Sequence, residues 1–176
     1  MRQEIFLEWT DATVPCLRWI MEWLAATAEE MRLLGKNQGL ATQPGRVIAL
    51  VGGLGAGKTQ WVKGFAEGIG YEGAVSSPTF GILHQYEGGR MPLFHYDFYR
   101  LQSGRELEET GWDEILDAQG VIVAEWGDLF APWLPEKTCW LHFQTNPDGT
   151  RTVKECPADF FPCYTGTLLE HEIPFV

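Results

Sequence analysis

The stretch RVIALVGGLGAGKTQWVKGF, residues 46–65, decides the fold. Its first part, Arg46–Val51, is short, apolar and rich in β-branched residues, which is typical of a buried strand in a parallel sheet. The glycine cluster that follows has the spacing G-x-x-x-x-G-K-[ST] and ends with Gly57, Lys58 and Thr59. Beyond it, apolar residues recur at helical spacing. A strand, a glycine loop and a helix in this order predict an α/β fold.

The glycine loop has the composition of a phosphate-binding site. Glycines allow successive amide N–H groups to converge on one anion, and the N-terminus of the next helix adds free N–H groups and a partial positive charge. In this motif the lysine lies along the β- and γ-phosphates and the threonine hydroxyl faces Mg²⁺. We therefore predict a nucleoside triphosphate site; a purely structural glycine turn is the alternative. The predicted binding residues here are Gly53, Leu54, Gly55, Ala56, Gly57, Lys58, Thr59 and Gln60.

The wider pattern predicts a P-loop NTPase fold, a three-layer sandwich whose mostly parallel central sheet is flanked by helices. Thr27 followed by Glu30 is a capping-box pattern, and it predicts a helix over residues 28–40. The stretch SSPTF, residues 76–80, reads as a polar loop, which we call the switch loop. Extended segments on both sides of a glycine pair at residues 88–89 predict a hairpin after it.

Length and composition favour one globular domain. The chain has 176 residues, of which 45% are hydrophobic. Its formal net charge of −11 argues against a direct grip on nucleic acid, which needs lysine and arginine, and suits partners with basic patches. We predict an ATPase domain over residues 24–156, an N-terminal extension over residues 1–23 and a C-terminal tail over residues 157–176.

The N-terminus and the cysteines bear on location. Glu4 and Glu8 interrupt the apolar residues at the start, which does not fit a signal peptide, and no stretch is long and apolar enough to span a membrane. The 4 cysteines have no CxxC spacing, which favours reduced thiols, although a disulfide pair stays open. We therefore expect a cytoplasmic protein.

Two acidic residues outside the loop are candidates for the remaining chemistry. Glu125 ends the apolar stretch VIVAE, and beside the glycine-loop strand it would lie near the Thr59 hydroxyl as the second acid that a triphosphate site needs near its magnesium. Asp97 shares a strand face with His95 and is a catalytic candidate that would orient the attacking water or a magnesium-bound water. The alternatives are a turn cap for Glu125 and an ion pair with Arg100 for Asp97. For His95 we favour a hydrogen-bonded core role over a catalytic one.

The switch loop supplies a further catalytic candidate. Pro78 stiffens this loop, and Thr79 could sense the γ-phosphate, so that the loop is ordered when triphosphate is bound. An ordinary turn is the alternative. Lys58, Asp97 and Thr79 are therefore the predicted catalytic residues.

Taken together, these motifs resemble the TsaE family, also called YjeE, small P-loop ATPases needed to make N6-threonylcarbamoyladenosine on tRNA. The resemblance covers about residues 27–151. The glycine loop alone is shared with many NTPases, but its combination with the later motifs is far more specific. The motifs are GLGAGKT (53–59), SPTF (77–80), PLFHYDFYRL (92–101), ELEETGWDEILD (106–117) and VIVAEW (121–126).

The resemblance implies ATP and Mg²⁺ as cofactors, with Lys58 and Thr59 on phosphate and magnesium and Glu125 as a metal ligand. It also implies a switch role for Thr79 and a functional Asp97. The implied partners are the proteins TsaB and TsaD, whose assembly ATP hydrolysis resets between rounds of threonylcarbamoyl transfer. The resemblance brings in tRNA only through that complex, and it implies no membrane partner.

At the positions that bear on contacts to the nucleotide, the chain matches the family pattern only in part. The resemblance implies a functional Trp126, and we predict that Trp126 and Arg151 also contact the nucleotide. The chain departs from the usual family pattern at Gly53, Gln60 and Met31, positions that bear on the base and ribose.

Other functions remain open on this scaffold. A small-molecule kinase would need more arginines for its lid than Arg105 and Arg151, which are the only ones after Arg100. A GTPase would need an Asn-Lys-x-Asp string, which is absent. A regulator that binds nucleotide without hydrolysing it fits the same residues. Because no arginine finger is evident, we expect slow hydrolysis by the isolated chain.

Overall fold

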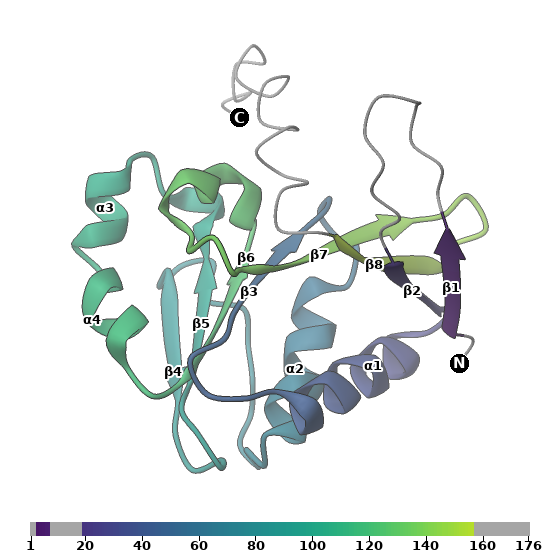
Figure 1. Cartoon of the computed structure of the whole chain (residues 1–176), viewed down its shortest axis with the longest axis horizontal. Coiled ribbons are helices and arrows are strands. Elements are labelled where there is room, and N and C mark those ends of the chain that lie inside the picture. Colours follow the sequence, from purple (N-terminus) through teal and green to yellow (C-terminus); the bar gives the residue numbers. More distant parts are fainter. Residues whose placement is uncertain (1–2, 8–18, 157–176) are drawn as a thin grey trace.

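In the computed structural model, which describes residues 3–7 and 19–156, the chain forms one eight-stranded sheet with helices on both faces (Figure 1). The strand order is β1-β2-β8-β7-β3-β6-β5-β4. The strands are β1 (Gln3–Leu7), β2 (Trp19–Ala25), β3 (Val47–Val51), β4 (Leu83–Tyr86), β5 (Leu93–Asp97), β6 (Val121–Glu125), β7 (Cys139–Thr145) and β8 (Arg151–Cys156). The helices are α1 (Ala28–Ala41), α2 (Lys58–Gly68), α3 (Gly104–Glu108) and α4 (Trp112–Asp117), with 3-10 segments η1 (Phe98–Arg100) and η2 (Gly127–Trp133).

The centre of the sheet is parallel. Strands β7, β3, β6 and β5 run in the same direction, and antiparallel strands flank them on both sides. The predicted α/β P-loop class is confirmed, as is the hairpin after the switch loop, which is β4 and β5. Leu50, Glu125 and Asp97 lie in one register row across β3, β6 and β5. The carboxyl ends of these strands therefore meet at one edge of the sheet.

Helices α1 and α2 cover one face of the sheet and cross each other closely. As predicted, α1 begins after Thr27, whose hydroxyl accepts a hydrogen bond from the Glu30 amide. A Cβ atom added to Gly64 of α2 would collide with the carbonyl oxygen of Arg32 on α1, and one added to Gly35 would collide with that of Trp61. Glycine at these positions lets the two helix backbones touch.

The two faces of β5 have different chemistry. Phe94 and Tyr96 point to the face covered by α3 and α4, where they join an aromatic cluster with Trp112. His95 and Asp97 point to the α2 face, which confirms that they share one side. Both are buried, although neither is apolar. Polar side chains buried at this position need partners, and the site supplies them.

The ends of the chain are described only in part. β2 runs across the boundary placed between residues 23 and 24, because Glu22–Ala25 pair with Arg151–Lys154 of β8. Residues 1–2 and 8–18 of the predicted N-terminal extension, and the whole predicted tail 157–176, lie outside the described residues.

The structure also bears on the predictions about the cysteines and about membrane-spanning segments. Cys139 and Cys156 are free thiols, whereas Cys16 and Cys163 lie outside the described ranges. Among the helices that the structure describes, none has the length and apolarity to cross a membrane.

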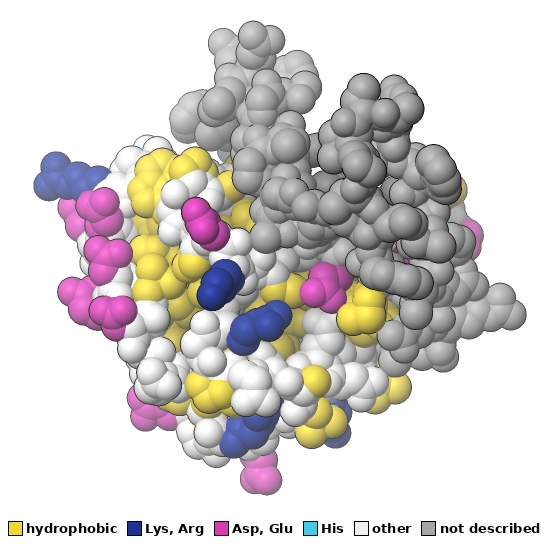
Figure 2. All heavy atoms as spheres, in the orientation of Figure 1, with side chains coloured by type: hydrophobic (Ala, Val, Ile, Leu, Met, Phe, Trp, Pro, Cys, Tyr) yellow, Lys and Arg dark blue, Asp and Glu magenta, His cyan; other side chains and the backbone are white. Residues whose placement is uncertain are grey.

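Acidic side chains gather over α3 and α4 (Figure 2). The sequence of these helices and their junction, GRELEETGWDEILD, supplies that charge. Gly111, with φ of 80°, separates the two helices and turns the chain between them.

Candidate nucleotide-binding site

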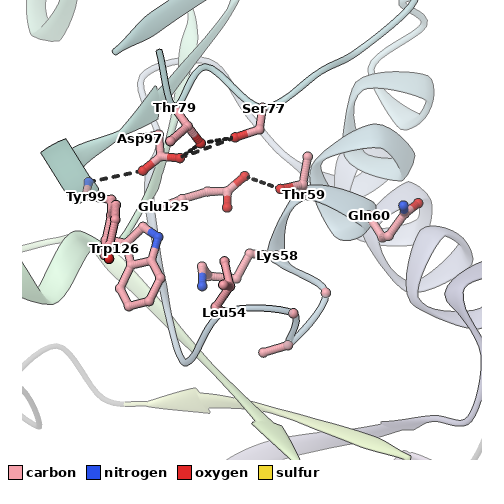
Figure 3. A pocket seen from close by; sticks show the side chains of 13 residues that line it. Leu54, Lys58, Thr59, Gln60, Ser77, Thr79, Asp97, Tyr99, Glu125 and Trp126 are labelled. Carbon is pink, nitrogen blue, oxygen red and sulfur yellow. Dashed lines mark hydrogen bonds between the residues drawn. The ribbon is translucent and has the colours of Figure 1, made fainter. Parts of the chain in front are cut away.

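A cavity of about 430 Å³ opens at the carboxyl edge of the parallel strands (Figure 3). The glycine loop after β3, the end of β5 and the end of β6 all contribute to it. The lining residues are Leu54, Gly55, Ala56, Gly57, Lys58, Thr59, Gln60, Ser77, Thr79, Asp97, Tyr99, Glu125 and Trp126.

The backbone of the glycine loop has conformations that favour glycine. Gly55 has φ of 77° and Gly57 has φ of 101°, both in the left-handed region. Gly57 is also the N-cap of α2, and no side chain caps this helix. The first-turn amides of α2 therefore lack the side-chain acceptor that usually satisfies them, which suits an anionic ligand. Met31 of α1 lies beneath the loop, since a Cβ on Gly57 would come within 3.3 Å of its Cε.

Lys58 is buried, with 5% of its surface exposed. Its Nζ donates hydrogen bonds to the carbonyl oxygens of Gly52, at 2.5 Å, and Gly53, at 3.0 Å. Burial lowers the pKa of Lys58, and the carboxylates of Glu125, Asp97 and Asp128 oppose that shift. The ammonium is therefore poorly solvated, and a phosphate in the cavity would supply a close counter-charge.

Trp126 closes one side of the site. It has φ of 59°, a left-handed conformation that costs a non-glycine residue about 1–3 kcal/mol. The Nζ of Lys58 lies 3.9 Å from the centroid of the Trp126 ring, a cation–π contact, and the Tyr99 ring lies 5.0 Å away from it. The strained turn after β6 thus places an aromatic ring beside the buried ammonium.

Thr59 and Glu125 form the candidate magnesium site. The Thr59 hydroxyl donates to Oε1 of Glu125 at 2.9 Å, and Glu125 is 3% exposed. Among the described residues, no group of three or more His, Cys, Asp or Glu side chains is arranged to hold a metal. Mg²⁺ in nucleotide sites commonly takes one or two protein oxygens and completes its shell with phosphates and water. This pair therefore fits magnesium bound together with a nucleotide.

Asp97 ties the switch loop to the end of β5. Its Oδ2 accepts hydrogen bonds from the hydroxyls of Thr79, at 2.5 Å, and Ser77, at 3.3 Å, and its Oδ1 accepts one from the Tyr99 amide at 3.1 Å. Asp97 is 2% exposed. The ion pair with Arg100 that sequence reasoning left open gains no support, because that guanidinium lies over the Phe80 ring, 5.3 Å from its centroid. The carboxylate instead holds the loop at the cavity.

Most of the predicted site residues line the cavity, but Arg151 does not. Those from Leu54 to Gln60, with Thr79, Asp97, Glu125 and Trp126, line the cavity, and Gly53 contributes the carbonyl that accepts from Lys58. Gln60 lies apart from the acidic cluster (Figure 3). Arg151 is not among the lining residues; it begins β8, and its guanidinium donates to the Gly149 carbonyl. The structure thus does not bring Arg151 to the cavity.

Sequence reasoning did not assign Ser77 and Tyr99, which line the cavity, or Asp128, whose carboxylate acts on the pKa of Lys58. Tyr99 follows Asp97 in a 3-10 turn, so strand alternation gave no indication that its ring would reach the cavity. Asp128 has a buried Oδ1 without a hydrogen-bond partner, and burial raises its pKa against the opposing effects of Lys58 and His142. The Glu-Trp motif at residues 125–126 indicated that the chain near Asp128 is functional. Nothing in the sequence distinguished Asp128 itself from an ordinary acid at the start of a helix.

Comparisons with known proteins agree with this geometry. The family model described as "Threonylcarbamoyl adenosine biosynthesis protein TsaE" matches residues 25–153. Over 133 residues the chain is 38% identical to the tRNA threonylcarbamoyladenosine biosynthesis protein TsaE of Bacillus subtilis (strain 168), covering 76% of the chain and 83% of that protein. The protein of the same name from Treponema pallidum (strain Nichols) is also 38% identical over 133 residues, which are 76% of the chain and 98% of the relative.

A solved structure extends the match to the fold. The crystal structure of Bacillus subtilis YdiB superposes with a TM-score of 0.68 at 31% sequence identity, covering 86% of this chain and 95% of that one. Because the family model spans most of the chain and relatives above 30% identity cover more than two thirds of it, the chain belongs to the TsaE family.

Proposed function

We propose that this chain binds and hydrolyses Mg·ATP in the cavity at the glycine loop, and thereby supports threonylcarbamoyladenosine formation on tRNA. The observation that carries the proposal is the convergence of Lys58, Thr59, Glu125 and Asp97 in one cavity from three separate segments of the chain. Membership of the TsaE family supports the role in tRNA modification, and the residues at the cavity support the binding and hydrolysis of Mg·ATP.

Binding begins with an exchange of partners at Lys58. Its ammonium now bonds to loop carbonyls and faces Trp126. These acceptors are neutral, and the carboxylates of Glu125, Asp97 and Asp128 offset the cost of burial only in part, so anionic phosphates are the stronger partners. The uncapped amides at the start of α2 add donors beside it.

Hydrolysis needs a metal and an oriented water. Thr59 and Glu125 would hold Mg²⁺, which supplies charge neutralisation on the phosphates. The Asp97 carboxylate is buried and already accepts bonds from Ser77, Thr79 and the Tyr99 amide. We assign it the role of accepting a hydrogen bond from the attacking water, with Thr79 reporting on the γ-phosphate through the same carboxylate.

The proposal includes partners. The site contains no cationic side chain other than Lys58 among its lining residues, so it offers little extra positive charge to a transition state. Slow hydrolysis by the isolated chain follows from that. We propose that TsaB and TsaD, in the cytoplasm, form the assembly on which this ATPase acts.

The test separates binding, turnover and pathway. A nonhydrolysable ATP analogue is titrated into wild type and Lys58→Ala by calorimetry, with GTP as competitor; we expect binding by wild type, loss in the variant and weak competition. ATP consumption and modified adenosine are then measured with TsaB, TsaD and substrate tRNA, omitting each component in turn. We expect turnover to rise in the full assembly.

Specific results would overturn the proposal. Failure of wild type to bind the analogue would remove the site. Binding without turnover in the full assembly would indicate a non-hydrolysing regulator, and transfer of phosphate to a metabolite would indicate a kinase. Fast hydrolysis by the isolated chain, equal to that of the assembly, would contradict the proposed role of the partners.

A further inference from the structure

We propose that His95 is a positioning residue, which holds the carboxylate of Glu125 in the orientation that magnesium binding requires. This inference rests on the proposed function, since it concerns the same metal site. Sequence reasoning favoured a hydrogen-bonded core role for this histidine, and the structure shows where that hydrogen bond goes. The Nε2 atom of His95 lies 3.0 Å from Oε1 of Glu125.

The topology brings the two side chains together. β5 and β6 are parallel neighbours, with His95 beside Val123 and Asp97 beside Glu125. Alternation puts His95 and Glu125 on the same face of the sheet, on adjacent strands and offset by two residues in register. His95 has no exposed surface and Glu125 has 3%. The hydrogen bond is therefore screened from water and fixed by the sheet itself.

The direction of the hydrogen bond is set by the acceptor. An ionised carboxylate only accepts, so Nε2 of His95 carries the hydrogen and donates it to Glu125. Nδ1 of His95 is buried and has no hydrogen-bond partner. An apolar residue of similar size would avoid that unsatisfied atom, so fold stability alone gives little reason for a histidine here. The bond to Glu125 does give a reason.

Packing keeps the imidazole ring in place. The Tyr86 ring on β4 lies 6.3 Å from it, measured between centroids. The Tyr86 hydroxyl in turn donates to the Ser76 carbonyl at 3.0 Å, at the start of the switch loop. Because the ring is enclosed by these groups and by the sheet, its Nε2–H group has little freedom to turn away from Glu125.

The hydrogen bond from His95 restricts the orientation of the Glu125 carboxylate. Its Oε1 accepts hydrogen bonds from both Thr59, at 2.9 Å, and His95, at 3.0 Å. Two donors on one oxygen fix the rotation of the group and leave Oε2 as the oxygen available to a cation. Partners of metal-binding carboxylates commonly contribute about 10–100-fold to metal affinity. We therefore expect His95 to act on magnesium, and on nucleotide only through magnesium.

The experiment measures a magnesium-dependent gain in affinity. A nonhydrolysable ATP analogue is titrated into each variant with Mg²⁺ and, separately, with EDTA, and the ratio of the two dissociation constants is the gain. For His95→Leu we expect the gain to fall about 10-fold, with the affinity in EDTA unchanged. His95→Gln should restore much of the gain, because its amide nitrogen reaches about as far as Nε2 and also donates a hydrogen.

Two further variants provide controls. Leu93→Ala lies on the same strand and the same face, fully buried in the core, so it should lower the melting temperature and leave the gain unchanged. Glu125→Gln should remove the gain, and adding His95→Leu to it should have no further effect on the gain. If His95→Leu does not fold, His95→Asn replaces it, since its amide is too short to reach Glu125.

The outcomes separate this inference from the proposed function. If Glu125→Gln loses the gain but His95→Leu keeps it, the positioning role is overturned and the metal site stands. If Glu125→Gln keeps the whole gain, the proposed metal site fails, and the role of His95 fails with it. A lower melting temperature in His95→Leu with an unchanged gain would show a purely structural histidine.

Discussion

The glycines of the α1–α2 crossing and two glycines of the loop at the cavity, Gly53 and Gly55, lie in opposite packing environments. At the crossing, a Cβ on Gly35, Gly39, Gly64 or Gly68 would collide with the backbone of the other helix. At the loop, a Cβ on Gly53 or Gly55 would meet no atom within 4 Å. The crossing is close-packed, whereas the loop keeps open space at Gly53 and Gly55, although a Cβ on Gly52 would collide with the Phe143 carbonyl.

This difference separates stability from function. Substitutions at the crossing must disturb packing, because close-packed backbones cannot move apart without losing contacts along both helices. Substitutions at the cavity edge remove chemistry while leaving the core intact. We therefore expect changes at the crossing to lower the free energy of unfolding, and changes at the cavity edge to alter binding or turnover.

The largest effect is expected for Gly64→Ala. The added methyl group would collide with the Arg32 carbonyl and force the helices apart. We expect the free energy of unfolding to fall by about 3 kcal/mol, measured by urea denaturation. The folded fraction should bind the ATP analogue normally. Lys63→Ala on the same helix is the control and should change stability by less than about 0.5 kcal/mol. An unchanged free energy of unfolding in Gly64→Ala would show that the two helices can accommodate a methyl group at the crossing.

Asp97→Asn should have nearly as large an effect, but on turnover. Ser77 and Thr79 carry hydroxyls that can both donate and accept, so the amide keeps hydrogen bonds at this position while losing the charge. We expect hydrolysis in the full assembly to slow about 100-fold, equivalent to about 2.7 kcal/mol. Affinity for the analogue and the melting temperature should change little. Normal hydrolysis by Asp97→Asn would remove its assigned role.

A smaller effect is expected on the stability of Lys58→Met. Burial lowers the pKa of this lysine, so the folded state disfavours its charged form. That cost is present below the folded pKa and disappears as pH rises to the unfolded value of 10.5. At pH 7 the variant should therefore melt at or above wild type, and the difference should narrow as the pH approaches 10.5. A clear loss of stability at pH 7 would instead make Lys58 a structural residue.

The smallest effect is expected for Gly53→Ala. Gly53 does not have a positive φ, and the new methyl group would enter open space. Reduced freedom of the unfolded chain should raise stability by about 0.5 kcal/mol, measured by thermal unfolding. Gly55→Ala is the matched contrast, because its φ of 77° penalises any side chain. Equal effects at the two positions would contradict this account of the loop.

Local pattern was enough to predict much of the architecture. The glycine loop, the helix cap at Thr27 and the β4–β5 hairpin each depend on residues close together in the chain, and each is confirmed. Alternation along β5 also predicted that His95 and Asp97 share a face. These features follow from short-range backbone geometry, which neighbouring residues decide.

The long-range contacts of the site were beyond that reasoning. The placement of Tyr99 in the cavity depends on a 3-10 turn that breaks strand alternation. The contact of Lys58 with Trp126 depends on a left-handed turn at a tryptophan, a conformation that side chains of this size rarely adopt. Arg151 was predicted at the nucleotide, yet the strand order places β8 beyond β7, away from the glycine loop.

The sequence by itself determined the glycine loop, the kinds of elements that surround it and the residue types that we propose to bind phosphate and magnesium, because these follow from local conformation and side-chain chemistry. Only the tertiary structure decided that Thr59 and His95 donate to the same oxygen of Glu125, and that Asp97 holds the switch loop through Thr79. Those contacts join residues far apart in the chain. Strand order and register bring them together, and no local pattern encodes either of these directly.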